Sequence, residues 1–230
     1  MTGSIHGVGV GPGDPELMTL KAQRVIGAAD AVFYISADGK PSRALATARK
    51  ALSPGVEEVP ILMPMRADPA EGAAIYDSAA EEIAERARHG QAVAVLCEGD
   101  PLLYGSFLHL LERLRPDFEP EVVPGIPSFL AAAAAAATPL VRRTESVSLL
   151  PGTLPKAELA MRLAACDCAA ILKTGKRLPD VRAALEETGM ADDALVIEEA
   201  TTPAERIRRL AELEDDHLPY FALILAWRAE

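Results

Sequence analysis

Apolar and polar positions alternate along the first half of the chain as expected for strands followed by amphipathic helices. Apolar runs typical of strands occupy residues 5–10, 31–35, 56–59, 92–97 and 121–123. Apolar residues at helical spacing occupy residues 15–29, 42–52, 70–89, 103–114 and 128–137. The run 92–97 is almost entirely apolar, which is typical of a strand covered on both faces of a parallel sheet. This half is therefore predicted to be α/β.

A second alternation begins after residues 139–144, where no element is predicted. Strands are predicted at 146–150, 168–173, 194–198 and 220–227, with helices near 156–165, 177–187 and 203–213. We therefore expect an N-terminal α/β domain at 1–141 and a C-terminal α/β domain at 142–230. A cleft between two such domains is a common place for a ligand.

Composition and charge narrow the class of protein. Half of the 230 residues are hydrophobic and 25% are charged, which is typical of a globular chain. The 23 Lys and Arg against 34 Asp and Glu give a net charge of −11, which argues against a nucleic-acid partner. A locally basic pocket for an acidic small molecule remains compatible with this charge.

The cysteines, the N-terminal segment and the longest apolar tract bear on the cellular compartment and on metal or membrane association. Cys97, Cys166 and Cys168 have neither the number nor the spacing of a disulfide framework or a zinc site, and the four histidines are scattered. The start has no signal-peptide pattern, and the longest apolar tract, 126–140, is too broken and short to span a membrane. We expect a cytoplasmic protein without metal or membrane association.

A glycine-rich segment, GVGVGPGD at residues 7–14, follows the first strand. Glycines there allow close approach of a backbone to a ligand. The dinucleotide fingerprint nevertheless fails, since Pro12 and Asp14 occupy the two possible positions of its last glycine, and no Gly-Lys pair indicates a phosphate loop. The segment is either a tight turn or a binding loop of another kind.

Two further segments follow strands and precede helices. The first, CEGDPLLYGS at 97–106, carries the carboxylates Glu98 and Asp100; Asp100 either caps the next helix or, like Glu98, binds an ammonium group or ribose hydroxyls. The second, VPGIPSF at 123–129, places Ser128 either as a helix cap or as a ligand contact.

These three segments, in this order, resemble the tetrapyrrole methylase family, whose members use S-adenosylmethionine on a two-domain α/β fold. The resemblance implies that the cofactor lies in the cleft between the domains and that the protein is a homodimer. In the first domain it implies cofactor contacts at Pro12, Glu98, Gly99, Asp100, Leu103, Pro127 and Ser128. In the second domain it implies adenosine-side contacts at Thr174 and Ala200.

Within the family, segments 63–65, 99–107, 123–129, 199–203 and 219–223 are most similar to members that methylate carbon 20 of precorrin-2 in cobalamin biosynthesis. Glu98 stands where many members carry a small residue, which favours a metal-free acceptor. Alternatives are a cobalt-containing acceptor, another corrin position, modification of a protein or ribosomal RNA, and a non-catalytic nucleotide sensor.

A sulfonium methyl group is already activated, so the enzyme must mainly align it with a nucleophilic carbon and exclude water. No residue is identified as a base; Tyr104 is either a group near the reacting centre or a packing residue. The carboxylates of a tetrapyrrole call for cations. Candidates in predicted loops or strand ends are Arg66, Arg142, Arg143 and Lys173, of which the Arg142-Arg143 pair lies at the predicted domain junction.

Overall fold

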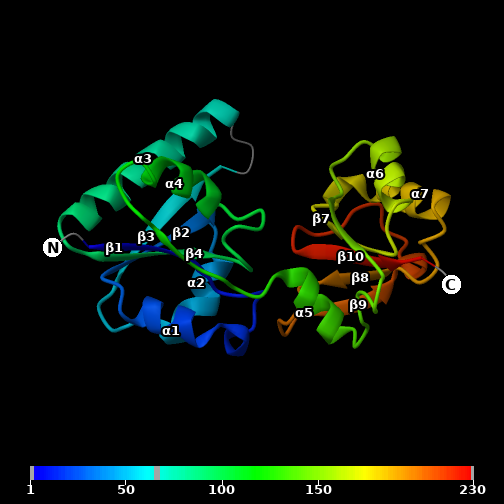
Figure 1. The fold of residues 1–230 in the computed structure, drawn as a ribbon, viewed down its shortest axis with the longest axis horizontal. Coiled ribbons are helices and arrows are strands. Elements are labelled where there is room, and N and C mark those ends of the chain that lie inside the picture. The colour runs from blue at the N-terminus through cyan, green and yellow to red at the C-terminus, as the bar shows by residue number, and fades with distance from the viewer. Residues whose placement is uncertain (1–2, 65–67, 229–230) are drawn as a thin grey trace. The chain divides into compact units, whose positions relative to one another are not determined.

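The computed structural model describes residues 3–64 and 68–228 and divides into two compact units, Met1–Pro127 and Ser128–Glu230 (Figure 1). This division falls earlier than the boundary of 141/142 expected from the sequence. Helix α5 (Ser128–Ala135) belongs with the second unit, because Ala132 and Ala133 pack in one cluster with Leu223 and Leu225 of the second sheet.

The first unit is built on a five-stranded parallel sheet in the order β3-β2-β4-β1-β5. Its strands are β1 (Ser4–Gly9), β2 (Ala31–Ala37), β3 (Glu57–Met63), β4 (Ala92–Cys97) and β5 (Glu121–Val123). Strand β4 lies inside the sheet with residues 93–97 buried, which confirms the prediction from its continuous apolar sequence.

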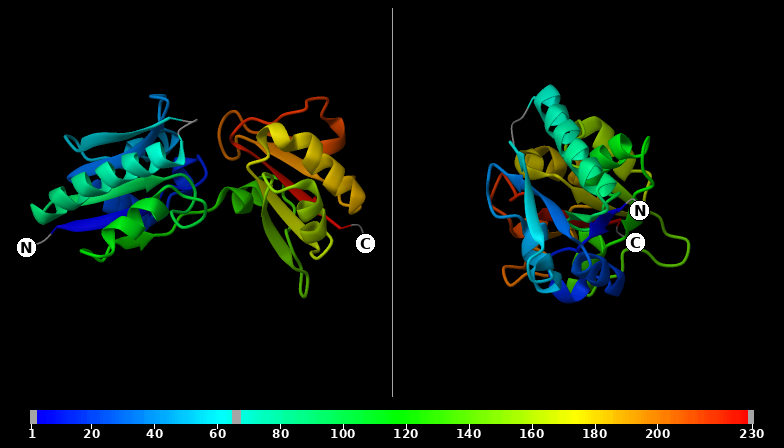
Figure 2. Two further views of the ribbon diagram at one scale, coloured as in Figure 1. Left: turned by 90° about the horizontal axis from the view of Figure 1, so that it is seen from above. Right: turned by 90° about the vertical axis from the view of Figure 1, so that its left-hand side faces the viewer.

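The helices of this unit cover both faces of its sheet (Figure 1). They are α1 (Leu20–Gly27), α2 (Arg43–Ala48), α3 (Pro69–Arg88) and α4 (Phe107–Leu114). The first two pack on one face and the last two on the other, and α3 lies over the sheet when seen from above (Figure 2). Right-handed crossovers require this arrangement. The chain moves toward the β3 edge of the sheet from β1 to β2, and toward the β5 edge from β4 to β5, so the connecting helices lie on opposite faces. The loops after the adjacent strands β1 and β4 therefore leave toward opposite faces, the arrangement in which open α/β sheets bind ligands.

Four predicted boundaries in this unit are corrected. The segment 15–29 is a 3-10 turn at Pro15–Leu17 followed by α1, because Thr19 Oγ1 accepts a hydrogen bond from Ala22 N at 3.1 Å and starts a new helix. Helix α4 starts at Phe107 rather than 103. Strand β3 continues through Pro60, which an edge strand tolerates because its outer N–H needs no partner. The helix expected at 42–52 is α2 followed by a 3-10 turn at Arg49–Ala51.

The second unit contains a five-stranded mixed sheet in the order β6-β7-β10-β8-β9. Its elements are β6 (Val147–Pro151), α6 (Lys156–Leu163), β7 (Cys168–Leu172), a 3-10 turn (Gly175–Arg177), α7 (Leu178–Glu187), β8 (Leu195–Glu198), β9 (Arg206–Arg209), a 3-10 turn (Leu210–Glu212) and β10 (Ala222–Trp227). Strand β10 is antiparallel to both β7 and β8. Helices α6 and α7 cover one face and α5 the other, so the α/β prediction is confirmed.

The helix predicted at 203–213 is wrong. Arg206–Arg209 forms strand β9, antiparallel to β8, with Ile207 opposite Ile197. The charged residues have helical spacing, which favours a helix locally. In the fold the segment instead pairs with β8, which satisfies its backbone hydrogen bonds and places Ile207 beside Ile197. None of the helices in the described ranges 3–64 and 68–228 is long and apolar enough to cross a membrane.

Candidate functional site

Three loops of the first unit meet where their strands end. Gly9 is the last residue of β1, Gly99 follows β4 and Gly125 follows β5. A Cβ built on Gly125 would lie 2.0 Å from the Gly99 carbonyl oxygen, and one on Gly9 would lie 2.6 Å from the same oxygen. The backbones are in contact, so only glycine fits. The structure thus brings together the three segments that the sequence singled out.

Backbone hydrogen bonds tie the β1 loop to the β4 loop. Gly99 N donates to Gly11 O at 2.8 Å and Gly11 N donates to Gly99 O at 3.3 Å, which forms an isolated antiparallel bridge. Both glycines have positive φ, 83° at Gly11 and 64° at Gly99, which favours glycine there. Pro12, a proposed cofactor contact, follows this bridge directly and is buried.

Asp100 connects the β4 loop to the β5 loop. Its Oδ1 accepts a hydrogen bond from Leu102 N at 2.9 Å, and its Oδ2 accepts one from Gly125 N at 3.1 Å. Helix α4 begins only at Phe107, so Asp100 does not cap it and that alternative is wrong. The side chain holds two loops in register, and Leu103 lies half-buried in the segment that it orders.

Glu98 contacts helix α2. Its Oε1 accepts a hydrogen bond from Ala44 N at 3.2 Å, across 54 residues of sequence. Arg43 precedes Ala44; burial lowers the pKa of its guanidinium, and the nearby Glu98 carboxylate partly offsets that effect. Arg43 is a charged group of this region that the sequence analysis missed, and no local sequence signal connects it with Glu98.

Tyr104 and Ser128 lie in different surroundings. Tyr104 has a φ of 54° in the loop before α4, and 45% of its surface is exposed. Ser128 is the first residue of α5, and Pro127 directly precedes it; both are half-buried. A left-handed conformation at a tyrosine is unfavourable and persists only where the surroundings enforce it, a feature common at functional sites.

In the second unit, Thr174 and Ala200 lie at one edge of the sheet. Thr174 follows β7 and Ala200 follows β8, and the start of β10 lies between those strand ends. Thr174 is 2% exposed, and its Oγ1 has no hydrogen-bond partner among the described residues. Ala200 is 8% exposed, and within the described part of the chain neither its N–H nor its C=O is hydrogen-bonded. Buried polar groups without partners are costly, so they indicate a ligand at this edge.

The same edge carries unusual backbone conformations. Lys173, Glu199 and Thr201 have φ values of 59°, 53° and 65°. Lys173 is exposed beside the buried Thr174. Non-glycine residues in this region of φ are strained, and three of them beside two groups of unpartnered polar atoms strengthen the assignment of a binding edge.

The other basic candidates lie elsewhere. Arg142 lines a hollow of about 470 Å³ together with Asp167, Leu195 and Trp227. Asp167 directly precedes β7, Leu195 starts β8 and Trp227 ends β10. That is the opposite edge of the second sheet from Thr174. Arg143 is exposed with a φ of 46°. Arg66 lies outside the described residues.

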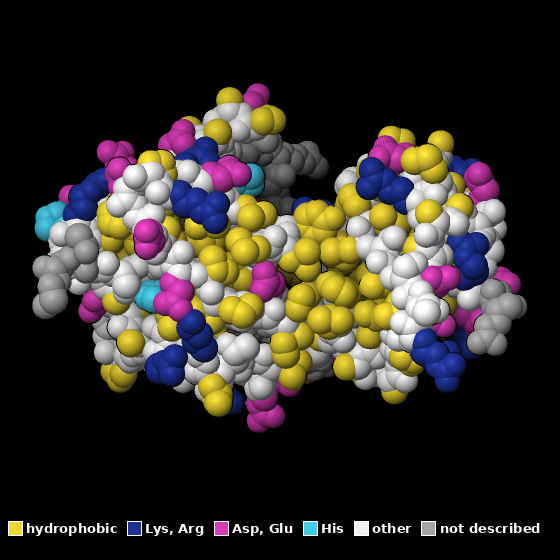
Figure 3. Space-filling model, viewed as in Figure 1, with side chains coloured by type: hydrophobic (Ala, Val, Ile, Leu, Met, Phe, Trp, Pro, Cys, Tyr) yellow, Lys and Arg dark blue, Asp and Glu magenta, His cyan; other side chains and the backbone are white. Residues whose placement is uncertain are grey.

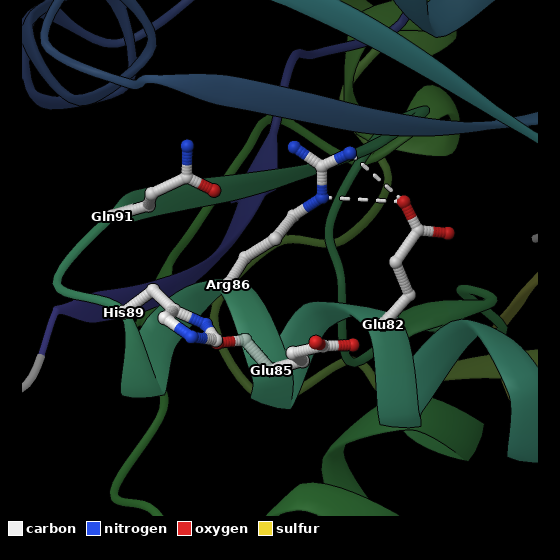
Figure 4. Close-up of a pocket in the computed structure, with 5 residues that line it drawn as sticks. All are labelled: Glu82, Glu85, Arg86, His89 and Gln91. Atoms are coloured by element: carbon white, nitrogen blue, oxygen red, sulfur yellow. Dashed lines mark hydrogen bonds and ion pairs between the residues drawn. The ribbon is translucent and has the colours of Figure 1, made fainter.

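A second hollow, of about 410 Å³, lies at the end of α3 (Figure 4). Arg86 donates to both oxygens of Glu57, at 2.6 and 2.7 Å, and to Glu82, and its guanidinium lies 5.5 Å from the centre of the Phe33 ring. These contacts raise the pKa of Arg86, chiefly through its hydrogen bond to Glu57. The cluster fastens α3 to the sheet, so we assign this hollow a structural role.

Within the described residues, neither the cysteines nor the surface charge indicates a second functional site. Burial raises the pKa of Cys97 to about 12, so its thiol stays protonated and unreactive. Among the described residues no group of His, Cys, Asp and Glu side chains is arranged to hold a metal ion. On the face drawn in Figure 3, acidic and basic side chains are interspersed.

Comparison with known proteins identifies the class. The model of the family described as Tetrapyrrole (Corrin/Porphyrin) Methylases matches residues 4–214. The chain therefore belongs to the tetrapyrrole methylase family, and the resemblance noted from the sequence is confirmed.

Three curated relatives illustrate where in the family it falls. Precorrin-2 C(20)-methyltransferase of Sinorhizobium sp is 41% identical over 97% of this chain and 94% of the relative. Cobalamin biosynthesis protein CobIJ of Mycobacterium tuberculosis is 43% identical over 97% of this chain. The chain spans 46%, about half, of that longer protein. Cobalt-precorrin-2 C(20)-methyltransferase of Salmonella typhimurium is 35% identical over 98% of this chain and 96% of the relative.

The solved structures agree on the fold. Uroporphyrin-III C-methyl transferase of Thermus thermophilus, complexed with S-adenyl homocysteine, is similar with a TM-score of 0.69 and 29% identity, covering 98% of this chain and 97% of that one. The two-unit α/β architecture is therefore that of the family.

Proposed function

We propose that this protein is an S-adenosylmethionine-dependent methyltransferase that methylates carbon 20 of precorrin-2 in cobalamin biosynthesis. The observation that carries the proposal is the 41% identity to the Sinorhizobium precorrin-2 C(20)-methyltransferase over nearly the whole of both chains. In the reaction, the electron-rich carbon 20 attacks the methyl carbon and the S–CH3 bond breaks. S-adenosylhomocysteine leaves, and the proton on carbon 20 is lost to the surroundings.

The residues present suit this cofactor. In the first unit we propose contacts from the joined loops, at Pro12, Glu98, Gly99, Asp100, Leu103, Pro127 and Ser128. The glycine contacts support this, since they let the backbones of the three loops pack directly against one another at the ends of their strands. In the second unit we propose Thr174 and Ala200 for the adenosine part. The buried Thr174 Oγ1 and the N–H and C=O of Ala200 support this, since none of them has a hydrogen-bond partner among the described residues.

Bound S-adenosylmethionine supplies an activated methyl group, so the chain's own residues mainly position and exclude water. The hydrogen bonds of Asp100 fix the loop that carries Leu103 and Tyr104. We propose Tyr104 as a side chain next to the reacting carbon, where its ring shields the methyl group from water. Its left-handed backbone is unfavourable for a tyrosine, so the surrounding structure must hold the residue in this conformation.

Cations are proposed to bind the carboxylates of the tetrapyrrole. Lys173 is supported best, since it is exposed at the edge that carries Thr174. Arg143 and Arg142 remain proposals, and Arg66 is proposed from the sequence alone. We further propose a cytoplasmic homodimer; the three buried, unpaired cysteines agree with a reducing compartment.

The test is an anaerobic incubation with S-adenosylmethionine and either metal-free precorrin-2 or its cobalt-containing counterpart. Product mass and NMR locate the added methyl group. We expect one methyl at carbon 20 of the metal-free compound. Reaction with the cobalt compound alone would move the protein to the activity named for the Salmonella relative, the second candidate, which 35% identity supports. Binding of the cofactor without methylation of either acceptor would refute the proposed substrate.

A further inference from the structure

Loop 199–205 joins β8 to β9 and presents Ala200, the residue proposed to contact the adenosine. The residues on both sides of Ala200 have positive φ, 53° at Glu199 and 65° at Thr201. A β-branched threonine is especially disfavoured there. Such a conformation persists only when other groups in the structure hold it.

Two side chains of the loop hold the peptide groups on either side of Ala200. Thr201 N donates to the Glu205 carboxylate at 2.6 Å. The Glu199 carbonyl oxygen accepts from Thr202 Oγ1 at 2.8 Å and from Thr202 N at 3.0 Å. Glu205 and Thr202 thus each fix one peptide plane.

Peptide geometry converts these bonds into an orientation for Ala200. In a planar trans peptide, the C=O and N–H point in opposite directions. Fixing Thr201 N–H on Glu205 therefore directs the Ala200 C=O away from Glu205. Fixing the Glu199 C=O on Thr202 likewise directs the Ala200 N–H away from Thr202. These are the donor and acceptor that remain without a partner among the described residues.

The ends of the loop are fastened independently. Glu199 N donates to Phe221 O at 2.8 Å, and Arg208 Nη2 donates to Glu198 Oε1 at 2.7 Å. A change at Glu205 therefore leaves β8 and β9 anchored, so its effect is confined to the peptides beside Ala200.

We propose that Glu205 and Thr202 are positioning residues that present the Ala200 N–H and C=O to the purine of the cofactor. The inference rests on the proposed function. Adenine offers an amino donor beside a ring-nitrogen acceptor, which complements one C=O and one N–H. A 6-oxopurine has the reverse pattern, so these two peptide groups would select adenine.

The test compares S-adenosylhomocysteine with S-inosylhomocysteine by calorimetry on the full chain. We expect wild type to bind the adenosyl ligand at least about tenfold more tightly, since a buried mismatched pair costs that much. Glu205→Ala should lose about tenfold in adenosyl affinity and leave inosyl affinity unchanged, so that the ratio falls. Glu205→Gln retains an acceptor oxygen and should keep the wild-type ratio of adenosyl to inosyl affinity. Thr202→Val should lower this ratio. Glu214→Ala changes an exposed carboxylate, should leave the ratio unchanged and is the matched control.

Each other outcome is decisive. Equal losses for both ligands in Glu205→Ala would mean that Glu205 only stabilises the fold, and an unchanged ratio would remove its role. A wild-type ratio near one would show that Ala200 does not read the purine, while methylation could still proceed. Failure of wild type to bind either ligand would instead overturn the proposed function, and the inference with it.

Discussion

The carboxylate of Asp100 accepts a hydrogen bond from the backbone N–H of Gly125 at 3.1 Å, which joins two loops that are 25 residues apart in sequence. Its other oxygen orders its own loop through Leu102 N. Asp100 therefore acts on cofactor binding by holding the loops after β4 and β5 in register. A direct contact with the cofactor is a separate proposal, which the same variant examines.

Replacing Asp100 with alanine should weaken cofactor binding without unfolding the protein. Two backbone N–H groups lose their acceptor, which costs about 1–2 kcal/mol or roughly tenfold or more in affinity if the loops must be ordered on binding. Calorimetry with S-adenosylhomocysteine measures the affinity, and thermal unfolding checks the fold. Asp117→Ala, which removes a surface ion pair with Arg88, is the control. Unchanged affinity in Asp100→Ala would take Asp100 out of the site.

Gly125→Ala should abolish cofactor binding. The added Cβ would lie 2.0 Å from the Gly99 carbonyl oxygen, so the β4 and β5 loops must separate. Gly72→Ala, in α3 where no atom lies within 4 Å of the added Cβ, should be neutral or stabilise by about 0.5–1 kcal/mol. Ligand titration of both variants measures the contrast. Wild-type affinity in Gly125→Ala would contradict the close packing of the loops.

Much of the fold could be predicted because its signals are local. The strands at 92–97 and 121–123 coincide with β4 and β5, since their apolar runs end at turns. The helix expected at 203–213 failed because the alternative, pairing Ile207 with Ile197 across two strands, depends on contacts distant in sequence. Helix α4 was placed too early because a tyrosine in the left-handed conformation, Tyr104, leaves no sequence signal.

The site was predictable as a set of loops rather than as a set of contacts. Parallel strands place their carboxyl ends at one edge, and the segments after β1, β4 and β5, which the family resemblance groups as cofactor contacts, meet there. That Asp100 bonds Gly125, and Glu98 bonds Ala44, follows only from the tertiary fold. Arg142 illustrates the limit: the sequence places it near the predicted domain junction, and only the fold shows that it lines a hollow at the sheet edge opposite Thr174.

Stability should fall as the pH drops below the ordinary histidine range, and His6 should account for part of the loss. Burial lowers the pKa of His6. The Glu121 carboxylate, whose Oε2 lies 3.3 Å from His6 Nδ1, raises this pKa in part, and the charge of Lys21 lowers it further. The unfolded chain then binds a proton at a higher pH than the folded chain does, so stability is full above about pH 6.5 and falls as the pH drops below it. Urea unfolding at pH 7.5, 6.5 and 5.5 measures the slope. His6→Gln should flatten the slope and exposed His217→Gln should preserve it; equal slopes in all three proteins would rule His6 out.

Lys173→Met should raise KM for the tetrapyrrole several-fold and leave the affinity for S-adenosylhomocysteine unchanged. Lys173 is exposed beside Thr174, where its ammonium group can meet a substrate carboxylate. Arg142→Met changes a cation at the opposite edge of the same sheet and should have the smaller effect. Steady-state kinetics on both variants compare the two positions. A larger KM change in Arg142→Met would reverse the assignment.

Arg208→Met should be among the most destabilising changes in the second unit. Glu198 is 7% exposed, and Arg208 Nη2 donates to its carboxylate at 2.7 Å. Removing the arginine leaves a buried carboxylate without its partner, which costs about 3 kcal/mol, at the low end for buried pairs because Arg208 itself is partly exposed.

Glu198→Gln in the Arg208→Met background removes the uncompensated charge and should recover part of the loss. Urea unfolding of both single variants and the double variant gives the coupling energy. If the two single losses simply add in the double variant, the ion pair does not stabilise the end of β8, and the backbone pairing of β8 with β9 and the bond from Glu199 N to Phe221 O hold the ends of the loop.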